Sequence, residues 1–211
     1  MTVDEIYKLA APRFRRKRIE RFQRYLSPRE STTILDVGGC SRYWENGKPT
    51  GKITILNLPS YVPPTQFQGY GLVFGDGLEL PFLDKSFDIA HSNGVLVNLG
   101  TWERQLAFSK ELRRVARGLW VQTPSKHFPI ECQTFDPFFH WFPARIQRLA
   151  LRHFTIWGWI TRPTQAEVDA YLANNRMSTY REMQEMFPDC TILREKVAGL
   201  TKSYVAWRPA S

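Results

Sequence analysis

Along the chain, short apolar runs alternate with longer segments in which apolar residues recur with the period of a helix. The short runs are rich in β-branched residues, and most end in glycine, asparagine, aspartate or proline. They span 32–39 (TTILDVGG), 52–58 (KITILNL), 71–76 (GLVFGD), 87–93 (FDIAHSN) and 119–124 (LWVQTP). Because these runs are apolar on both faces, they predict parallel strands covered by helices, which is the α/β class.

A helical pattern precedes the first of these runs. Within residues 3–26, Ile19, Phe22 and Leu26 have the spacing of one helical face, and the other face is basic. We interpret residues 1–28 as a surface helix with a solvated basic face. An anion-binding or substrate-covering helix is the alternative.

Further elements follow the fourth run. Residues 101–117 have helical period, with Thr101 as the expected N-cap, and residues 177–188 predict a short helix that begins at a serine or threonine cap. The runs 190–199 and 202–209 predict two final strands. The order of strands and helices is that of one doubly covered sheet.

An aromatic-rich insertion, residues 124–176, interrupts this order after the fifth run. It contains no acidic residue between Asp136 and Glu167, and its stretch 143–163 is basic and apolar. We interpret the insertion as a lid over an acceptor pocket within a single domain, 1–211. Contact of the stretch with an anionic membrane surface remains an alternative.

Composition limits the classes of protein that fit. The share of hydrophobic residues is 43% and the net charge is +9, so a core is available and anionic partners remain open. No apolar run reaches the roughly 20 residues that cross a bilayer, and the first residues lack a secretory pattern. Cys40, Cys132 and Cys190 lie far apart without a CxxC pair. We therefore expect no disulfide framework and no metal site, and a reducing cytoplasm.

Polar side chains close three successive strand runs. Asp36, Asn57 and Asp76 follow one another at intervals of roughly 20 positions, the spacing at which a residue meets a ribose hydroxyl. Ligands of open parallel sheets bind outside the carboxyl ends of the strands. The loop 38–42 (GGCSR) lacks the third glycine of a dinucleotide loop, and the chain has no GxxxxGK[ST]. A nucleoside without phosphates fits this loop best.

The motifs ILDVGG, ITILNL, GDGLELPFLDKSFDIAHSNGVL and LWVQTPS resemble those of class I S-adenosylmethionine-dependent methyltransferases, in the small bacterial type 11 branch. The resemblance covers residues 30–123 closely and 178–208 in outline. It implies a Rossmann-like, seven-stranded, mostly parallel sheet with helices on both faces, an antiparallel last strand, and S-adenosylmethionine as cofactor.

The resemblance also implies positions for the cofactor contacts. Asp36, Gly38 and Gly39 would meet its amino acid part. Asn57 would face the ribose hydroxyls. Leu58 and Leu78 would cover the adenine. Asp76 would accept a hydrogen bond from the adenine amino group, with Gly77 beside it. Ser92 and Asn93 would approach the methionine moiety.

The chain departs from the family pattern twice. Asn57 stands where the family usually has an acidic residue, and Val97 and Asn98 replace the Glu-His pair after the fourth strand. A base at that position is therefore in doubt, and His127 and Glu131 are the catalytic candidates instead. The candidates for substrate contact are Tyr43, Trp44, Phe135, His140 and Trp141.

These patterns favour transfer of a methyl group to an oxygen or nitrogen of a small molecule. An NAD-type Rossmann oxidoreductase is an alternative, and the missing third glycine counts against it. A cofactor-binding relative without catalysis, or one at a membrane surface, is another. RNA methylation stays open through the basic charge, whereas the lack of [DN]PP[YFW] after the fourth strand and of a Pro-Cys pair disfavours DNA.

Overall fold

The computed structural model describes residues 3–45, 47, 50–60, 69–131, 134 and 136–210, with side chains in the first helix from residue 15 onward. Seven strands form one sheet in the order β3-β2-β1-β4-β5-β7-β6. Their bounds are β1 Thr33–Val37, β2 Lys52–Asn57, β3 Gly71–Phe74, β4 Phe87–Asn93, β5 Ala116–Pro124, β6 Thr191–Val197 and β7 Leu200–Arg208. The pairs from β3 through β5 are parallel, and β7 runs antiparallel to β5 and β6. The predicted mostly parallel sheet with an antiparallel last strand is confirmed.

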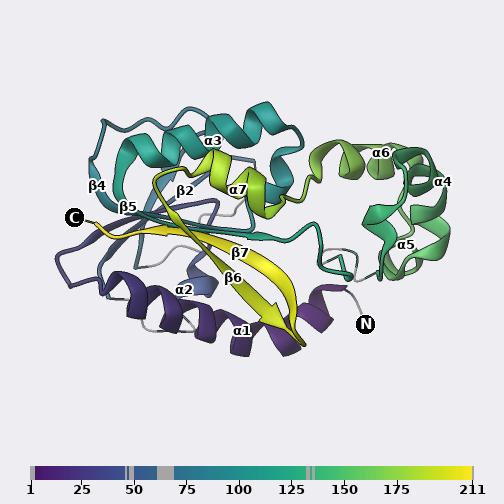
Figure 1. The fold of residues 1–211 in the computed structure, drawn as a ribbon, viewed down its shortest axis with the longest axis horizontal. Coiled ribbons are helices and arrows are strands. Elements are labelled where there is room, and N and C mark those ends of the chain that lie inside the picture. The colour runs from purple at the N-terminus through teal and green to yellow at the C-terminus, as the bar shows by residue number, and fades with distance from the viewer. Residues whose placement is uncertain are drawn as a thin grey trace.

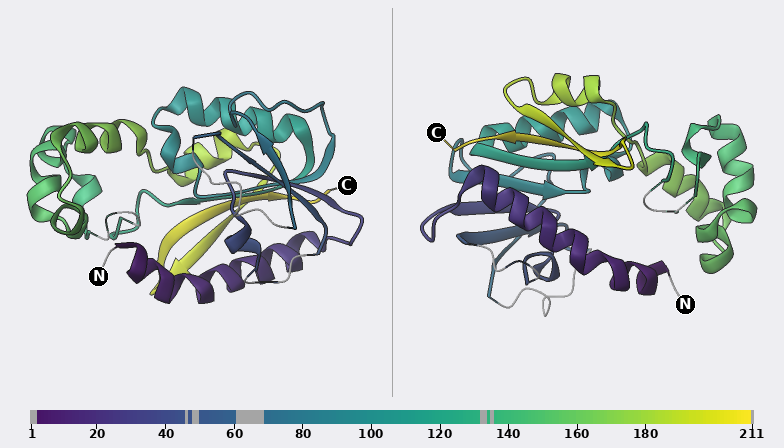
Figure 2. Two further views of the ribbon diagram at one scale, coloured as in Figure 1. Left: turned by 180° about the vertical axis from the view of Figure 1, so that it is seen from behind. Right: turned by 60° about the horizontal axis from the view of Figure 1, so that its bottom comes forward.

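Helices cover both faces of this sheet, as Figure 1 shows. Their bounds are α1 Val3–Leu26, α2 Ser41–Glu45, α3 Trp102–Val115, α4 Ala144–Phe154, α5 Ile156–Thr161, α6 Gln165–Asn174 and α7 Tyr180–Met186, with the short 3-10 helices η2 Leu96–Leu99 and η3 Phe139–Trp141. Helices α3 and α7 lie on one face, and α1 and α2 lie on the other (Figures 1 and 2).

Alternation along the strands divides the core into two clusters. On β1, Leu35 and Val37 belong to the cluster under α3 and α7, whereas Ile34 belongs to the aromatic cluster under α1 with Phe22 and Trp44. Side chains point to opposite faces at successive strand positions. Position 36 therefore faces the α1 side, and the fold places an aspartate inside that aromatic cluster.

The predicted caps form where the sequence places them. Thr101 caps α3 by accepting from the backbone N–H of Arg104. Thr179 caps α7 in a capping box with Glu182, which satisfies two helix-end donors. These caps fix where each helix begins after its loop.

The insertion folds into helices beyond the carboxyl end of β5 (Figures 1 and 2). Helices α4 to α6 share a small apolar cluster centred on Phe139, Leu151 and Val168. The returning chain is tied to the loop after β4, because the Arg176 N–H donates to the Val97 carbonyl over 2.8 Å. Whether the insertion acts as a lid stays a prediction.

Candidate cofactor and acceptor site

The glycine loop after β1 stands where the sheet order reverses. Strand β1 lies between β2 and β4, and the chain leaves it toward β2. Gly38 has a φ of +73°, and a Cβ there would lie 2.2 Å from a methyl carbon of Val95. Only glycine fits this position, because both the backbone conformation and the space exclude a side chain. The loop therefore occupies the switch point at which open α/β sheets bind ligands.

The carboxylate of Asp36 contacts other side chains of the protein. Its buried carboxylate accepts the Trp44 indole N–H at Oδ2 over 2.7 Å, and its Oδ1 lies 2.7 Å from His91 Nδ1. A Cβ at Gly39 would lie 1.7 Å from Asp36 Oδ2, so this glycine makes room for the carboxylate. The Asp36 carboxylate thus packs against the glycine loop. Its contact with a cofactor stays a prediction.

Asn57 joins the loops after β1 and β2. Its Nδ2 donates to the Gly39 carbonyl over 2.6 Å, and the side chain is buried. An ionised aspartate or glutamate has no proton to donate to a carbonyl, whereas an amide has two. The amide at position 57 therefore supplies a donor that an acidic side chain would lack.

The loop after β3 completes the same edge. Asp76 is exposed, and its Oδ1 accepts the Leu78 N–H over 2.9 Å, which forms a tight turn. A Cβ at Gly77 would lie 2.7 Å from the Phe108 ring, so the turn packs closely on α3. Leu78 packs against the core, whereas Leu58 is 49% exposed. The Asp76 carboxylate is accessible at this edge.

The end of β4 meets α1. Ser92 is buried and donates to the Val37 carbonyl over 3.0 Å, which links β4 to β1. Asn93 Oδ1 accepts from Arg18 Nη1 over 3.4 Å. The basic helix therefore reaches the strand end where the resemblance places the methyl donor.

A second polar network, which the sequence motifs do not predict, lies beside this end. Glu195 on β6 accepts from Arg21 and from Gln122, each over 2.5 Å, and also from Ser203. Gln122 is 2% exposed within an otherwise apolar run, and that polar residue is the signal by which the network could have been found. The network holds α1 against β5 and β6.

The catalytic candidates come from one connection but differ in their surroundings. His127 is exposed. Glu131 is buried, and its Oε2 accepts from the N–H and the hydroxyl of Thr134 over 2.6 and 2.8 Å. These bonds close a local turn. Catalytic roles for both residues stay predictions.

His140 is half-buried beside them. Its Nε2 lies 3.1 Å from the Lys126 carbonyl, which accepts, so Nε2 carries the proton. Burial lowers the pKa of His140, and the carbonyls of Lys126 and Phe128 oppose that shift. The imidazole is consequently neutral near pH 7.

The aromatic candidates for substrate contact divide between core and surface. Trp44 is fully buried and Tyr43 is 5% exposed, because α2 turns both inward against α1. Burial raises the pKa of the Tyr43 phenol. Trp141 is half-exposed and donates to the Lys126 carbonyl over 2.8 Å. Phe135 lies outside the described residues.

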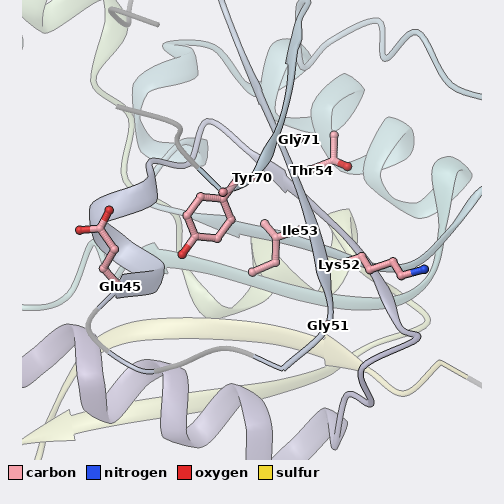
Figure 3. A pocket seen from close by; sticks show the side chains of 8 residues that line it. Glu45, Gly51, Lys52, Ile53, Thr54, Tyr70 and Gly71 are labelled. Carbon is pink, nitrogen blue, oxygen red and sulfur yellow. The ribbon is translucent and has the colours of Figure 1, made fainter. Parts of the chain in front are cut away.

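The hollows on the described part of the molecule include the following two. Figure 3 shows one of about 660 Å³, lined among others by Glu45, Lys52 and Tyr70, at the amino ends of β2 and β3. It lies at the edge opposite the glycine loop. The other, about 320 Å³, lies between η2 and α6 and is lined by residues that include Asn98 and Tyr171. No group of three metal-ligating side chains is placed to hold a metal ion among the described residues.

Comparisons with known proteins bear on the fold. No family model matches the chain. A protein of Encephalitozoon cuniculi (strain GB-M1) with a provisional methyltransferase name is 51% identical over 49 residues, which are 23% of this chain and 23% of that protein. The matched segment thus spans about a quarter of the curated relative.

Solved structures match over nearly the whole length. A SAM-dependent methyltransferase from Aquifex aeolicus has a TM-score of 0.53 at 15% identity, with 97% of this chain and 96% of that chain covered. The complex of the Haloferax volcanii Trm112 methyltransferase activator with a provisionally named methyltransferase gives 0.54 at 12% identity, covering 95% and 92%. The chain therefore has the Rossmann-like α/β fold of SAM-dependent methyltransferases.

Proposed function

We propose that this chain is an S-adenosylmethionine-dependent methyltransferase of the small bacterial type 11 branch, acting on an oxygen or nitrogen of a small molecule. One observation carries the proposal. Asn57 joins three strand-end loops, because its side chain binds the Gly39 carbonyl and its own carbonyl accepts the Gly75 N–H over 3.0 Å. Three loops are thus fixed at the switch point, which is where open α/β sheets bind ligands.

The residues of these loops favour a nucleoside without phosphates. Helix α2 after the glycine loop has five residues and no third glycine, so it offers a poor rest for a pyrophosphate. The exposed Asp76 carboxylate is an acceptor for an exocyclic amine. Both features fit the adenosine of S-adenosylmethionine better than a dinucleotide.

Methyl transfer asks mainly for positioning. S-adenosylmethionine, when bound, would supply an electrophilic methyl group on its sulfonium, with the thioether S-adenosylhomocysteine as the leaving group. The chain's contribution is to orient the acceptor in line and to take its proton where one is lost. The candidates for the second task are His127, which is exposed, and Glu131, which is buried.

Calorimetry tests cofactor binding. We expect the full chain to bind S-adenosylhomocysteine and not NAD, and Asp76→Ala to weaken that binding at least about tenfold through loss of a charge-assisted hydrogen bond. Asp84→Ala is the matched control, because Asp84 lies in the same β3–β4 connection and its side chain is 75% exposed. Binding of NAD alone would favour the oxidoreductase, and equal losses in the two variants would refute the adenine assignment.

The acceptor class needs a separate measurement. We expect methyl label from the cofactor, incubated with the enzyme and a cell extract, to appear in the small-molecule fraction. The result should not change after the extract is treated with ribonuclease. Label that disappears with ribonuclease would establish RNA as the acceptor and overturn this part of the proposal.

A further inference from the structure

Large apolar side chains are exposed in one part of the insertion. Ten of the sixteen exposed large apolar side chains in the described part of the chain fall between residues 130 and 160. Leu149 is 75% exposed, Phe154 is 74% and Trp159 is 65%. We define the α4–α5 face as Phe138, Trp141, Phe142, Ile146, Leu149, Phe154, Trp159 and Ile160. Such a concentration along the chain favours an interaction surface, because exposed apolar residues scattered singly are ordinary.

Helix α4 is apolar on two sides. Leu151 faces inward and packs with Phe139 and Val168 in the apolar cluster of the insertion, so this side of α4 is buried. Ile146 and Leu149, one turn apart, remain exposed on the other side. These exposed apolar side chains therefore do not contribute to the buried cluster of the insertion.

The charge around this face is positive. Residues 137–166 contain no aspartate or glutamate. Within the part of the chain that the structure describes, Arg148 pairs with Asp169 over 2.6 Å, whereas no ion pair holds Arg145, Arg152 or Arg162. These three guanidinium groups are exposed beside the apolar side chains.

We infer that the α4–α5 face binds the surface of an anionic lipid bilayer. Apolar and aromatic side chains flanked by unpaired arginines are the composition of helices that lie in the bilayer interface. A second copy of the chain fits worse, because a two-fold contact would set this face against itself and arginine against arginine. No helix in the described part is long and apolar enough to cross a membrane, so the contact is interfacial.

The helices that carry this face lie at one end of the molecule. Helices α4 and α5 form one end of the molecule, beyond the carboxyl end of β5, and the amino end of α1 lies on the same side in every view (Figures 1 and 2). The edge that carries the glycine loop would thus be held near the bilayer. The inference does not depend on the proposed methyl transfer.

Sedimentation with lipid vesicles tests the inference on the full chain. We expect binding to vesicles of phosphatidylcholine with phosphatidylglycerol, weakening as salt is raised, and far less binding to phosphatidylcholine alone. Leu149→Ser should weaken binding about tenfold, since burial of a leucine side chain is worth at least that factor. Arg145→Gln should weaken binding to the anionic vesicles only.

Matched variants separate this face from the rest of the surface. Leu83→Ser changes an 82% exposed leucine in the β3–β4 connection, and Arg104→Gln changes an exposed arginine on α3. Both should bind vesicles as the wild type does, and circular dichroism should show all four variants folded. Equal losses in controls and tests, no binding to anionic vesicles, or a dimer that Leu149→Ser dissociates would each overturn the inference. Because vesicle binding is measured without cofactor, its failure is distinct from failure of the proposed function.

Discussion

Replacing Trp44 with phenylalanine tests whether the Asp36 carboxylate belongs to the hydrogen-bonded core. The indole N–H donates to Asp36 Oδ2 over 2.7 Å, and both side chains are buried. Loss of a hydrogen bond to a charged group costs about 1.5–3 kcal/mol, and loss of part of the ring costs about 1–2 kcal/mol more. We expect the free energy of unfolding, measured with urea, to fall by about 2.5–5 kcal/mol.

Trp120→Phe is the matched variant. Trp120 is 1% exposed and packs edge-on against Phe22 at 5.9 Å between ring centroids, compared with 5.6 Å for Trp44. Its Nε1 has no hydrogen-bond partner among the described residues. Trp120→Phe should therefore cost only the packing part, and each kcal/mol of difference corresponds to about 2–4 °C in Tm. Equal losses in the two variants would refute the role assigned to the Trp44–Asp36 bond.

Two further substitutions test the loop and the insertion. Gly39→Ala should destabilise the protein by about 2 kcal/mol or more and weaken binding of S-adenosylhomocysteine, because its Cβ would stand 1.7 Å from Asp36 Oδ2; an unchanged urea midpoint would show that the loop relaxes freely. Burial lowers the pKa of His140, so its contribution to stability is present above the unfolded pKa of about 6.5 and is lost as pH falls through the folded pKa. As pH falls from about 7.5 to about 5, the unfolding free energy of the wild type should therefore decrease relative to that of His140→Gln. A difference that stays constant would contradict this reasoning.

The strands were predictable because their signal is local. Apolar runs bounded by turn residues gave the five parallel strands and the last two, and only their ends moved. Strand β5 begins at Ala116, before the predicted run, because Ala116 ends α3 in an extended conformation and the chain enters the sheet without a loop. Helix α2 was not predicted, since five residues carry too little periodicity.

The edge that carries the site was predictable, but the use of its side chains was not. Topology alone brings the carboxyl ends of β1, β2 and β3 together. The partners of Asp36 are set by packing between distant parts of the chain, because His91 lies on β4 and α2 turns Trp44 inward against α1. The sequence alone does not show whether an aromatic residue that follows a strand faces a ligand or the core.

The second departure from the family pattern has a structural counterpart in the insertion. Asn98 Nδ2 donates to the Gly94 carbonyl over 3.1 Å and so closes the turn after β4. Gln105 donates to the carbonyls of Leu96 and Arg176, over 2.8 and 2.7 Å, which ties η2 to the chain returning from the insertion. The loop after β4 thus anchors the insertion. We therefore expect any group that takes the acceptor's proton to come from the insertion, where His127 and Glu131 are the candidates.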